Sequence, residues 1–267
     1  MNARPHGPRA AITWLLEGFA LLRKQPLQLI SVVFLFFMLL LFFLFMPFPI
    51  SLLLNVLTPG LMAGLLYACA VVERGERLLP TALTAAFFTA DRSRAKPLLL
   101  LGVLYIGVSF LSFGALSLVT DLDQLFKQLA SAKSLPLLLL LNIVSIPLLT
   151  LMYYPPLLVA WHGVSPPKAV FFSLIALWRN LIPLLMLGLV MQLLTALASA
   201  ILIPLASLIA LAFKSNVLIV VLFFAVALTL IALIICCIHV SARRILDDGS
   251  EPTALATDKV TDEHSDT

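Results

Sequence analysis

The chain has 267 residues, of which 62% are hydrophobic and only 11% are charged. A soluble domain has about 45–50% apolar and about 25% charged residues, so the composition excludes an ordinary water-soluble protein. The formal net charge is +4 at pH 7. Because the cations are scattered at the edges of apolar segments, we attribute this charge to membrane topology and expect no nucleic-acid partner.

Six apolar segments are long enough to cross a bilayer as helices, which takes about 20 residues. None of them contains Asp, Glu, Lys, Arg or His. Their predicted ranges are 27–46, 50–72, 97–119, 135–161, 183–211 and 217–238. The sequence therefore predicts an all-α, polytopic membrane protein, with a six-span domain over 1–246. The polar, acidic tail over 247–267 is expected to be disordered.

The Lys and Arg residues predict the orientation, because short cytoplasmic flanks of membrane spans carry an excess of both. If the N-terminus is cytoplasmic, fourteen of these residues lie on the inner flanks and three on the outer flanks. The first apolar run is also longer than the core of a signal peptide, which has about 7–15 residues. We therefore expect a retained first span and both termini in the cytoplasm.

A repeated segment precedes the first, third and fifth spans, at residues 6–26, 74–97 and 162–183. Each copy begins with a Gly, continues with Pro-x-Ala and ends with an Arg shortly before a Pro that opens the next span. The two prolines lie 18, 17 and 16 residues apart in the three copies. Apolar residues at helical spacing between them predict an amphipathic interfacial helix and then a change of direction, which we call an elbow. The chain is thus expected to form three parallel helical hairpins, each preceded by an interfacial helix.

The end of each elbow supplies the candidate lipid contacts. Arg23, Arg94, Arg179 and Asn180 lie just before the Pro of the following span. A cation at that place favours the negative end of the helix dipole and can reach lipid phosphates. A purely structural elbow and a specific site for an anionic headgroup or substrate both fit these residues.

Prolines interrupt the even-numbered spans. Pro59 with Gly60 lies midway along the second span, Pro147 midway along the fourth, and Pro155 near the end of the fourth. A Pro inside a helix removes a backbone hydrogen bond and bends the helix. These four residues are candidate hinges, with helix packing as the alternative. Gly60 and Gly64 also form a GxxxG motif, which indicates a close helix contact within the chain.

Polar side chains are few within the spans. Asn55, Asn142 and Gln192 are the candidate intramembrane polar residues. Hydrogen bonds between helices explain such residues, and a polar cavity is the alternative.

Enzyme signatures are missing from the sequence, including the HExxH, GxSxG, GxxxxGK[ST] and GxGxxG motifs. We therefore predict no enzyme, no catalytic residue, no cofactor and no metal site. Cys69, Cys236 and Cys237 show no metal-ligand spacing and are interpreted as small apolar residues in a reducing compartment.

Three stretches resemble an uncharacterised family of proteobacterial inner-membrane proteins: WLLEGFALLRKQP, TPGLMAGLLYA and PPLLVAWHGVSPPKAVFFSLIALWRNLIPLL. The resemblance covers residues 12 to about 244. Its most specific part is Trp161-His162-Gly163, then Ser173, then Arg179-Asn180 and Pro183. The resemblance implies six spans and a bacterial inner-membrane location, and supplies no activity. A looser likeness is to the membrane-anchor domains of some glycerophosphodiester phosphodiesterases, whose catalytic domain the sequence lacks.

Two classes of function fit the sequence. The first is a non-enzymatic membrane protein that binds anionic lipid headgroups or a membrane protein partner, which the short loops and basic elbows favour. The second is a transporter or channel for a small or lipid-like molecule, which the parallel repeat and the interrupted spans favour. A mitochondrial-carrier mechanism is disfavoured, because no acidic and basic pair follows Pro26, Pro97 or Pro183.

Overall fold

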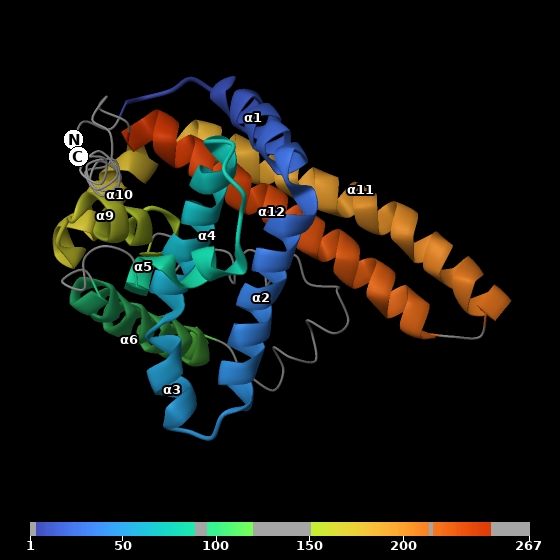
Figure 1. Cartoon of the computed structure of the whole chain (residues 1–267), viewed down its shortest axis with the longest axis horizontal. Coiled ribbons are helices and arrows are strands. Elements are labelled where there is room, and N and C mark those ends of the chain that lie inside the picture. The colour runs from blue at the N-terminus through green and yellow to red at the C-terminus, as the bar shows by residue number, and fades with distance from the viewer. Residues whose placement is uncertain (1–3, 89–94, 120–150, 214–215, 247–267) are drawn as a thin grey trace, which may run out of the picture. The chain divides into compact units, whose positions relative to one another are not determined.

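The structure is a computed structural model that describes residues 4–88, 95–119, 151–213 and 216–246. Within these ranges every regular element is a helix (Figure 1). The elements are α1 (Ala10–Lys24), α2 (Pro26–Phe45), α3 (Ile50–Asn55), α4 (Thr58–Glu73), the 3₁₀ helix η1 (Pro80–Thr84), α5 (Ala85–Phe88), α6 (Ala95–Val119), α9 (Pro155–His162), α10 (Pro166–Arg179), α11 (Leu181–Phe213) and α12 (Asn216–Leu246).

Five stretches of the described chain are long and apolar enough to span a membrane. They are Pro26–Phe45, Ile50–Glu73, Ala95–Leu118, Leu181–Ala206 and Val217–Leu246. The chain is therefore an all-α, polytopic membrane protein, as its composition predicts. The fourth predicted span, 135–161, lies mostly outside the described residues, so a count of six stays a prediction. The predicted tail over 247–267 also lies outside them.

The chain divides into two compact units. Among the described residues, the first comprises 4–39, 64–85, 175–213 and 216–246, and the second comprises 40–63, 86–88, 95–119 and 151–174. The boundaries pass through α2, α4 and α10, so each unit contains parts of several predicted hairpins.

In the first unit, α1 packs along α12, and α11 contacts both (Figure 1). The buried face of α1 carries Trp14, Gly18 and Leu21. A Cβ added to Gly18 would lie 2.7 Å from Cys237 Sγ of α12, so the missing side chain permits this close approach. The elbow helix of the first repeat is thus built into the protein on one side.

In the second unit, α6 packs against α9 and α3 packs against α6. Gly102 of α6 lies directly against the backbone carbonyl of Val56, at the end of α3. The apolar side chains of α6 are otherwise largely exposed, as expected of a helix that faces lipid.

Two of the repeat glycines end helices in the left-handed conformation. Gly75 has φ 78° and Gly163 has φ 64°, after the ends of α4 and α9. The N–H of Gly75 donates to Val72 O and that of Glu76 donates to Val71 O, which is the Schellman pattern. A Cβ at either glycine would meet open space, so conformation, and not crowding, requires Gly there.

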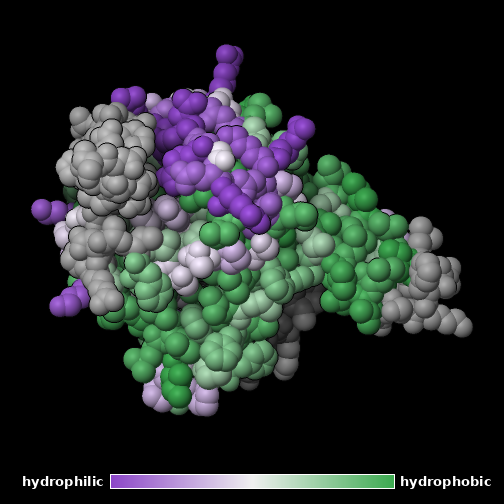
Figure 2. Space-filling view, viewed as in Figure 1, coloured by the Kyte–Doolittle hydropathy of each residue, from purple (hydrophilic) through white to green (hydrophobic). Residues whose placement is uncertain are grey.

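The surface of the first unit separates into two kinds of region. Figure 2 shows hydrophilic residues gathered over the part that holds α1 and the end of α4, and hydrophobic residues along the α11–α12 hairpin. Leu185, Leu189 and Leu193 are among the large apolar side chains exposed on α11. Such a belt of exposed apolar surface is what a lipid-facing hairpin requires.

Candidate functional site

A charged cluster joins the middle of α1 to the ends of α4 and α12 in the first unit. It consists of Glu17 of α1, Glu73 of α4, and His239, Arg243 and Arg244 of α12. Glu73 Oε2 lies 2.9 Å from His239 Nε2, and Glu73 Oε1 accepts a hydrogen bond from Arg243. Glu17 Oε1 lies 2.5 Å from Arg244 Nη2, and Glu17 Oε2 lies 3.5 Å from Arg243 Nη2. Arg243 therefore bridges the two carboxylates.

The spacing of α12 explains the cluster. His239 and Arg243 are four residues apart, which places them on one face of the helix, and that face meets Glu73. The imidazole of His239 is nearly buried, whereas the two glutamates are each about a quarter exposed at 28%. Paired in this way, the charges join α1, α4 and α12 at a partly shielded position.

The acidic residues of the described chain are all paired. Glu17 and Glu73 belong to the charged cluster, and Glu76 lies 2.6 Å from Arg74 Nε. That hydrogen bond lowers the pKa of the Glu76 carboxyl below its ordinary value. The described ranges hold eleven Lys and Arg against these three Glu, so cations outnumber carboxylates among the described residues.

The first elbow holds the segment that follows α4. The side chain of Gln25, between α1 and α2, donates from Nε2 to Glu76 O at 2.6 Å and accepts at Oε1 from Leu78 N at 3.1 Å. The neighbouring Lys24 donates to Glu73 O at 3.1 Å. We call the pair of bonds made by the amide the Gln25 clamp.

The third elbow holds the N-terminal segment in the same manner. Asn180, between α10 and α11, accepts at Oδ1 from His6 N at 2.9 Å and donates from Nδ2 to Arg4 O at 3.1 Å. Its Nδ2 also donates to Ala176 O at 3.0 Å, and Arg4 N donates to Ile245 O at 3.1 Å. We call the pair of bonds to the N-terminal segment the Asn180 clamp.

The two clamps match in detail. Each carboxamide pairs with the C=O of one residue and the N–H of the residue two positions later. Those residues lie four and two positions before a repeat proline, which is Pro80 for the Gln25 clamp and Pro8 for the Asn180 clamp. In both places, a residue at the end of one elbow therefore hydrogen-bonds to the backbone at the start of another elbow. The sequence analysis did not single out Gln25. Its position just before Pro26, the proline that ends the first repeat copy, was the available signal, because Asn180 likewise lies shortly before Pro183.

The elbow helices α1 and α10 confirm the helical part of the elbow prediction for the first and third repeats. The second repeat is different, because η1 and the short α5 replace a regular helix before the residues at 89–94, which lie outside the described ranges. Asp91 interrupts the apolar pattern of this copy.

The outer faces of α1 and α10 are apolar. The exposed large side chains on them are Ile12, Leu16 and Phe19, and Phe171, Leu174 and Trp178. The inner faces are buried within the protein. Each of these helices therefore has one face against the protein and another apolar face that a bilayer can cover.

The candidate lipid contacts differ in placement. Arg23 is exposed at the end of α1, with its guanidinium 5.8 Å from the centre of the Phe19 ring, and Arg179 is exposed at the end of α10. Arg94 lies outside the described residues. Asn180 is fully buried, and its amide is hydrogen-bonded within the protein. The expectation that it contacts lipid is therefore wrong, and its side chain forms a clamp instead.

The candidate hinges coincide with helix ends. The second predicted span breaks at Val56–Leu57, and Pro59 and Gly60 lie in the first turn of α4. Pro155 is the first residue of α9, and Pro147 lies outside the described residues. The structure thus shows interrupted helices at Pro59 and Pro155, whereas movement there stays a prediction.

The GxxxG motif makes internal contacts. A Cβ on Gly60 would meet the ring of Phe87, and a Cβ on Gly64 would meet the backbone carbonyl of Leu83. The second repeat therefore packs its short helical segment against α4 through these glycines.

The candidate intramembrane polar residues form no site together in the described chain. Asn55 donates to Ser51 O at 2.7 Å, within its own helix. Gln192 is exposed on α11, and Asn142 lies outside the described residues. The described residues also contain no group of three His, Cys, Asp or Glu side chains able to hold a metal ion.

No protein-family model matches the chain, and no solved structure matches it significantly. A curated protein of Burkholderia thailandensis, named as a probable inner membrane protein, is 29% identical over 185 residues. The alignment covers 64% of this chain and 68% of that protein. The similarity agrees with the polytopic membrane fold, and the name of that protein gives no activity.

Proposed function

We propose that the protein is a non-enzymatic bacterial inner-membrane protein that binds anionic phospholipid headgroups through the elbow helices α1 and α10. The observation that carries the proposal is the outer face of each helix, where exposed apolar side chains end in an exposed arginine. Arg23 follows Ile12, Leu16 and Phe19 along α1, and Arg179 follows Trp178 on α10. Apolar residues at the acyl boundary with cations at the headgroups are the pattern of an interfacial helix.

Charge supports the same proposal. The described ranges hold eleven Lys and Arg against three Glu, and each of these glutamates bonds Arg74, His239, Arg243 or Arg244. An anionic leaflet attracts such cations by about 1 kcal/mol each. The excess of Lys and Arg on the flanks that include the elbows supports a cytoplasmic location for them and for both termini. Inner-membrane location is supported by the Burkholderia relative and by the resemblance of the Trp161-His162-Gly163 region.

The test compares lipid retention in purified protein by native mass spectrometry. The variant Arg23→Gln/Arg179→Gln is compared with Arg74→Gln, which removes a charge that is already paired with Glu76. We expect the double variant to bind phosphatidylglycerol or cardiolipin about 25-fold more weakly, at about 1 kcal/mol per arginine. Equal retention in the double variant and Arg74→Gln would refute the proposal.

Orientation has a separate test. A cytoplasmic reporter fused after Leu246 is expected to be active, and a periplasmic reporter at the same place is expected to be silent. The reverse result would place the elbows on the other leaflet.

A transporter or channel for a small or lipid-like molecule is the second candidate. The break before α4 favours it, because interrupted helices at membrane depth often line binding sites. Thr58, which opens α4, is buried, and its hydroxyl has no hydrogen-bond partner among the described residues. A stoichiometric non-lipid metabolite in the same mass spectra would favour transport. A recurrent co-purified membrane protein would instead favour a scaffold role for the elbows.

A further inference from the structure

Two thiols face each other between α4 and α12 in the first unit. Cys69 Sγ and Cys236 Sγ are 3.9 Å apart, and both residues are fully buried. The next residue along α12, Cys237, lies against Gly18 of α1 instead. The three cysteines of the chain therefore divide into one facing pair and one thiol on a different side of α12.

The same two helices make a Glu–His hydrogen-bond contact one turn farther along. Glu73 is four residues after Cys69, and His239 is three residues after Cys236. Residues three or four apart lie on one face of a helix, so the sulfur pair and the Glu73–His239 contact of 2.9 Å are successive contacts along one helix seam. Arg243, which also donates a hydrogen bond to Glu73, further stabilises this contact between α4 and α12. The charged cluster thus keeps the two sulfurs near each other.

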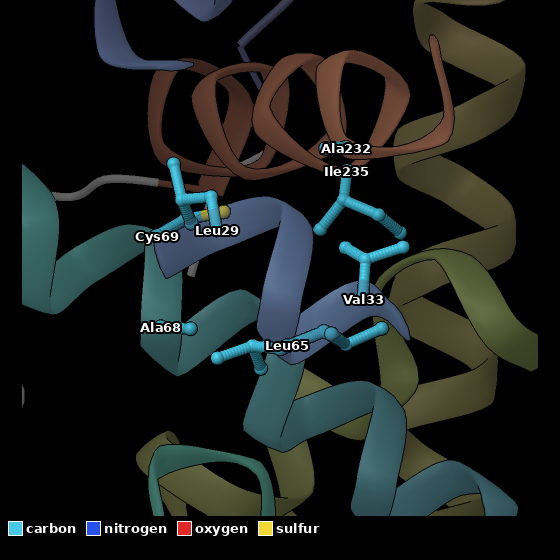
Figure 3. A pocket seen from close by; sticks show the side chains of 8 residues that line it. Leu29, Val33, Leu65, Ala68, Cys69, Ala232 and Ile235 are labelled. Carbon is cyan, nitrogen blue, oxygen red and sulfur yellow. The ribbon is translucent and has the colours of Figure 1, made fainter. Parts of the chain in front are cut away.

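The surroundings of Cys69 are apolar. A narrow crevice, too small to hold a bound molecule, lies between α2, α4 and α12 and is lined by Leu29, Val32, Val33, Leu65, Ala68, Cys69, Ala232 and Ile235. Figure 3 shows the side chains of Leu29, Val33, Leu65 and Ile235 around it, with Cys69 at its edge. A lipid-soluble reagent suits this environment better than a charged, water-soluble one.

We propose that Cys69 and Cys236 are a redox-active dithiol, which a lipid-soluble quinone oxidises to an intramolecular disulfide that locks α12 to α4 beneath the charged cluster. In this step both S–H bonds break and one S–S bond forms. The two electrons and two protons pass to the quinone, which leaves as the quinol. The sulfurs close from 3.9 Å to a bond of about 2.05 Å, which side-chain rotation and a small helix displacement supply. The inference is independent of lipid binding by the elbows.

The test uses the full-length protein in liposomes with a short-chain alkyl benzoquinone as the probe. Free thiols are counted by maleimide labelling after unfolding, and the bond is located by peptide mapping of monomeric protein. Wild type is expected to fall from three free thiols to one, and Cys237→Ser from two to none. Cys69→Ser and Cys236→Ser are expected to keep both remaining thiols. A wild type that keeps all three thiols, or a bond that includes Cys237, would overturn the proposal.

Two further readouts separate the parts of the proposal. Oxidised glutathione outside the bilayer is expected to oxidise the pair more slowly than the quinone, and the opposite order would overturn the lipid-side route. Oxidation is expected to raise the unfolding temperature of wild type and Cys237→Ser by about 5 °C. An unchanged or lower unfolding temperature in oxidised protein would overturn the lock.

Discussion

The Gln25 clamp and the Asn180 clamp use the same chemistry in two different environments. Both are side-chain carboxamides that pair with a backbone C=O and the N–H two residues later. The side chain of Gln25 is half-buried, its bond to Glu76 O is exposed and its bond from Leu78 N is part-buried, whereas Asn180 is 0% exposed and both of its clamp bonds are part-buried. A comparison of the two clamps therefore tests whether burial of the carboxamide increases the contribution of such a clamp to the free energy of unfolding.

Support from neighbouring contacts also differs between the clamps. The loop held by Gln25 is held as well by Lys24, which donates to Glu73 O, and by the charged cluster that includes Glu73. The N-terminal segment held by Asn180 has one other long-range hydrogen bond among the described residues, which Arg4 N donates to Ile245 O. We infer that Asn180 is the harder of the two residues to replace.

The largest effect is expected from Asn180→Ala. Removal of a buried amide leaves its backbone partners without their bonds, which costs about 1–3 kcal/mol. We expect a loss of about 2 kcal/mol in the free energy of unfolding in detergent, with faster amide hydrogen exchange at residues 4–6. Ser199→Ala is the matched control, since Ser199 is only partly buried and its hydroxyl donates to Thr195 O in its own helix. A cost no larger than that of the control would remove the clamp role from Asn180.

A smaller effect is expected from Gln25→Ala. Water can replace the lost partner of an exposed backbone group, so the cost should be near the net value of about 0.5–1 kcal/mol for a hydrogen bond. Hydrogen exchange should accelerate at residues 76–78 and stay unchanged at 4–6. If Gln25→Ala costs as much as Asn180→Ala, burial does not distinguish the clamps and the comparison fails.

Local patterns in the sequence predicted the elements well. Apolar runs predicted the positions of the spans that are described, and the Gly, Pro-x-Ala and Arg-to-Pro spacing predicted helices before Pro26 and Pro183. The spacing could not show what Asn180 does, because a buried clamp and an exposed anion contact use the same residue type at a helix end. The second elbow departs from the pattern where Asp91 interrupts its apolar spacing.

Contacts between distant residues could not be predicted from the sequence. Glu73 and His239 are 166 residues apart, and Cys69 and Cys236 are 167 apart. Helical periodicity fixes which residues of one helix share a face, but it carries no information on which other helix meets that face. For this reason the cysteines were interpreted singly as small apolar residues, and Glu17 and Glu73 were not assigned a role.

The smallest effect is expected from acidification, which should weaken the Gln25 clamp and leave the Asn180 clamp unchanged. Glu76 provides the backbone oxygen that Gln25 binds, while its carboxylate accepts from Arg74. This bond holds the pKa of Glu76 below its ordinary value, which is about 4.3 in unfolded chains. The folded-state pKa is the lower one, so Glu76 stabilises the fold above about pH 4.3, and that contribution is lost as the pH falls through the folded-state pKa. Because the pair is largely solvent-exposed, we expect only a few tenths of a kcal/mol.

The other glutamates titrate in the same range, so the measurement must be a difference between wild type and Glu76→Gln. The difference in free energy of unfolding should be largest at pH 6 and should shrink toward zero near pH 3. The protection factor for hydrogen exchange at residues 76–78, which corrects for the intrinsic slowing of amide exchange in acid, should fall with acid in wild type and less so in Glu76→Gln. Protection at residues 4–6, held by the Asn180 clamp, should show no dependence on this substitution. A difference that grows as the pH falls would mean that the Arg74 contact does not stabilise the ionised carboxylate. Residues 76–78 would then be held mainly by Gln25. In that case Gln25→Ala should lower the free energy of unfolding by more than the value expected above.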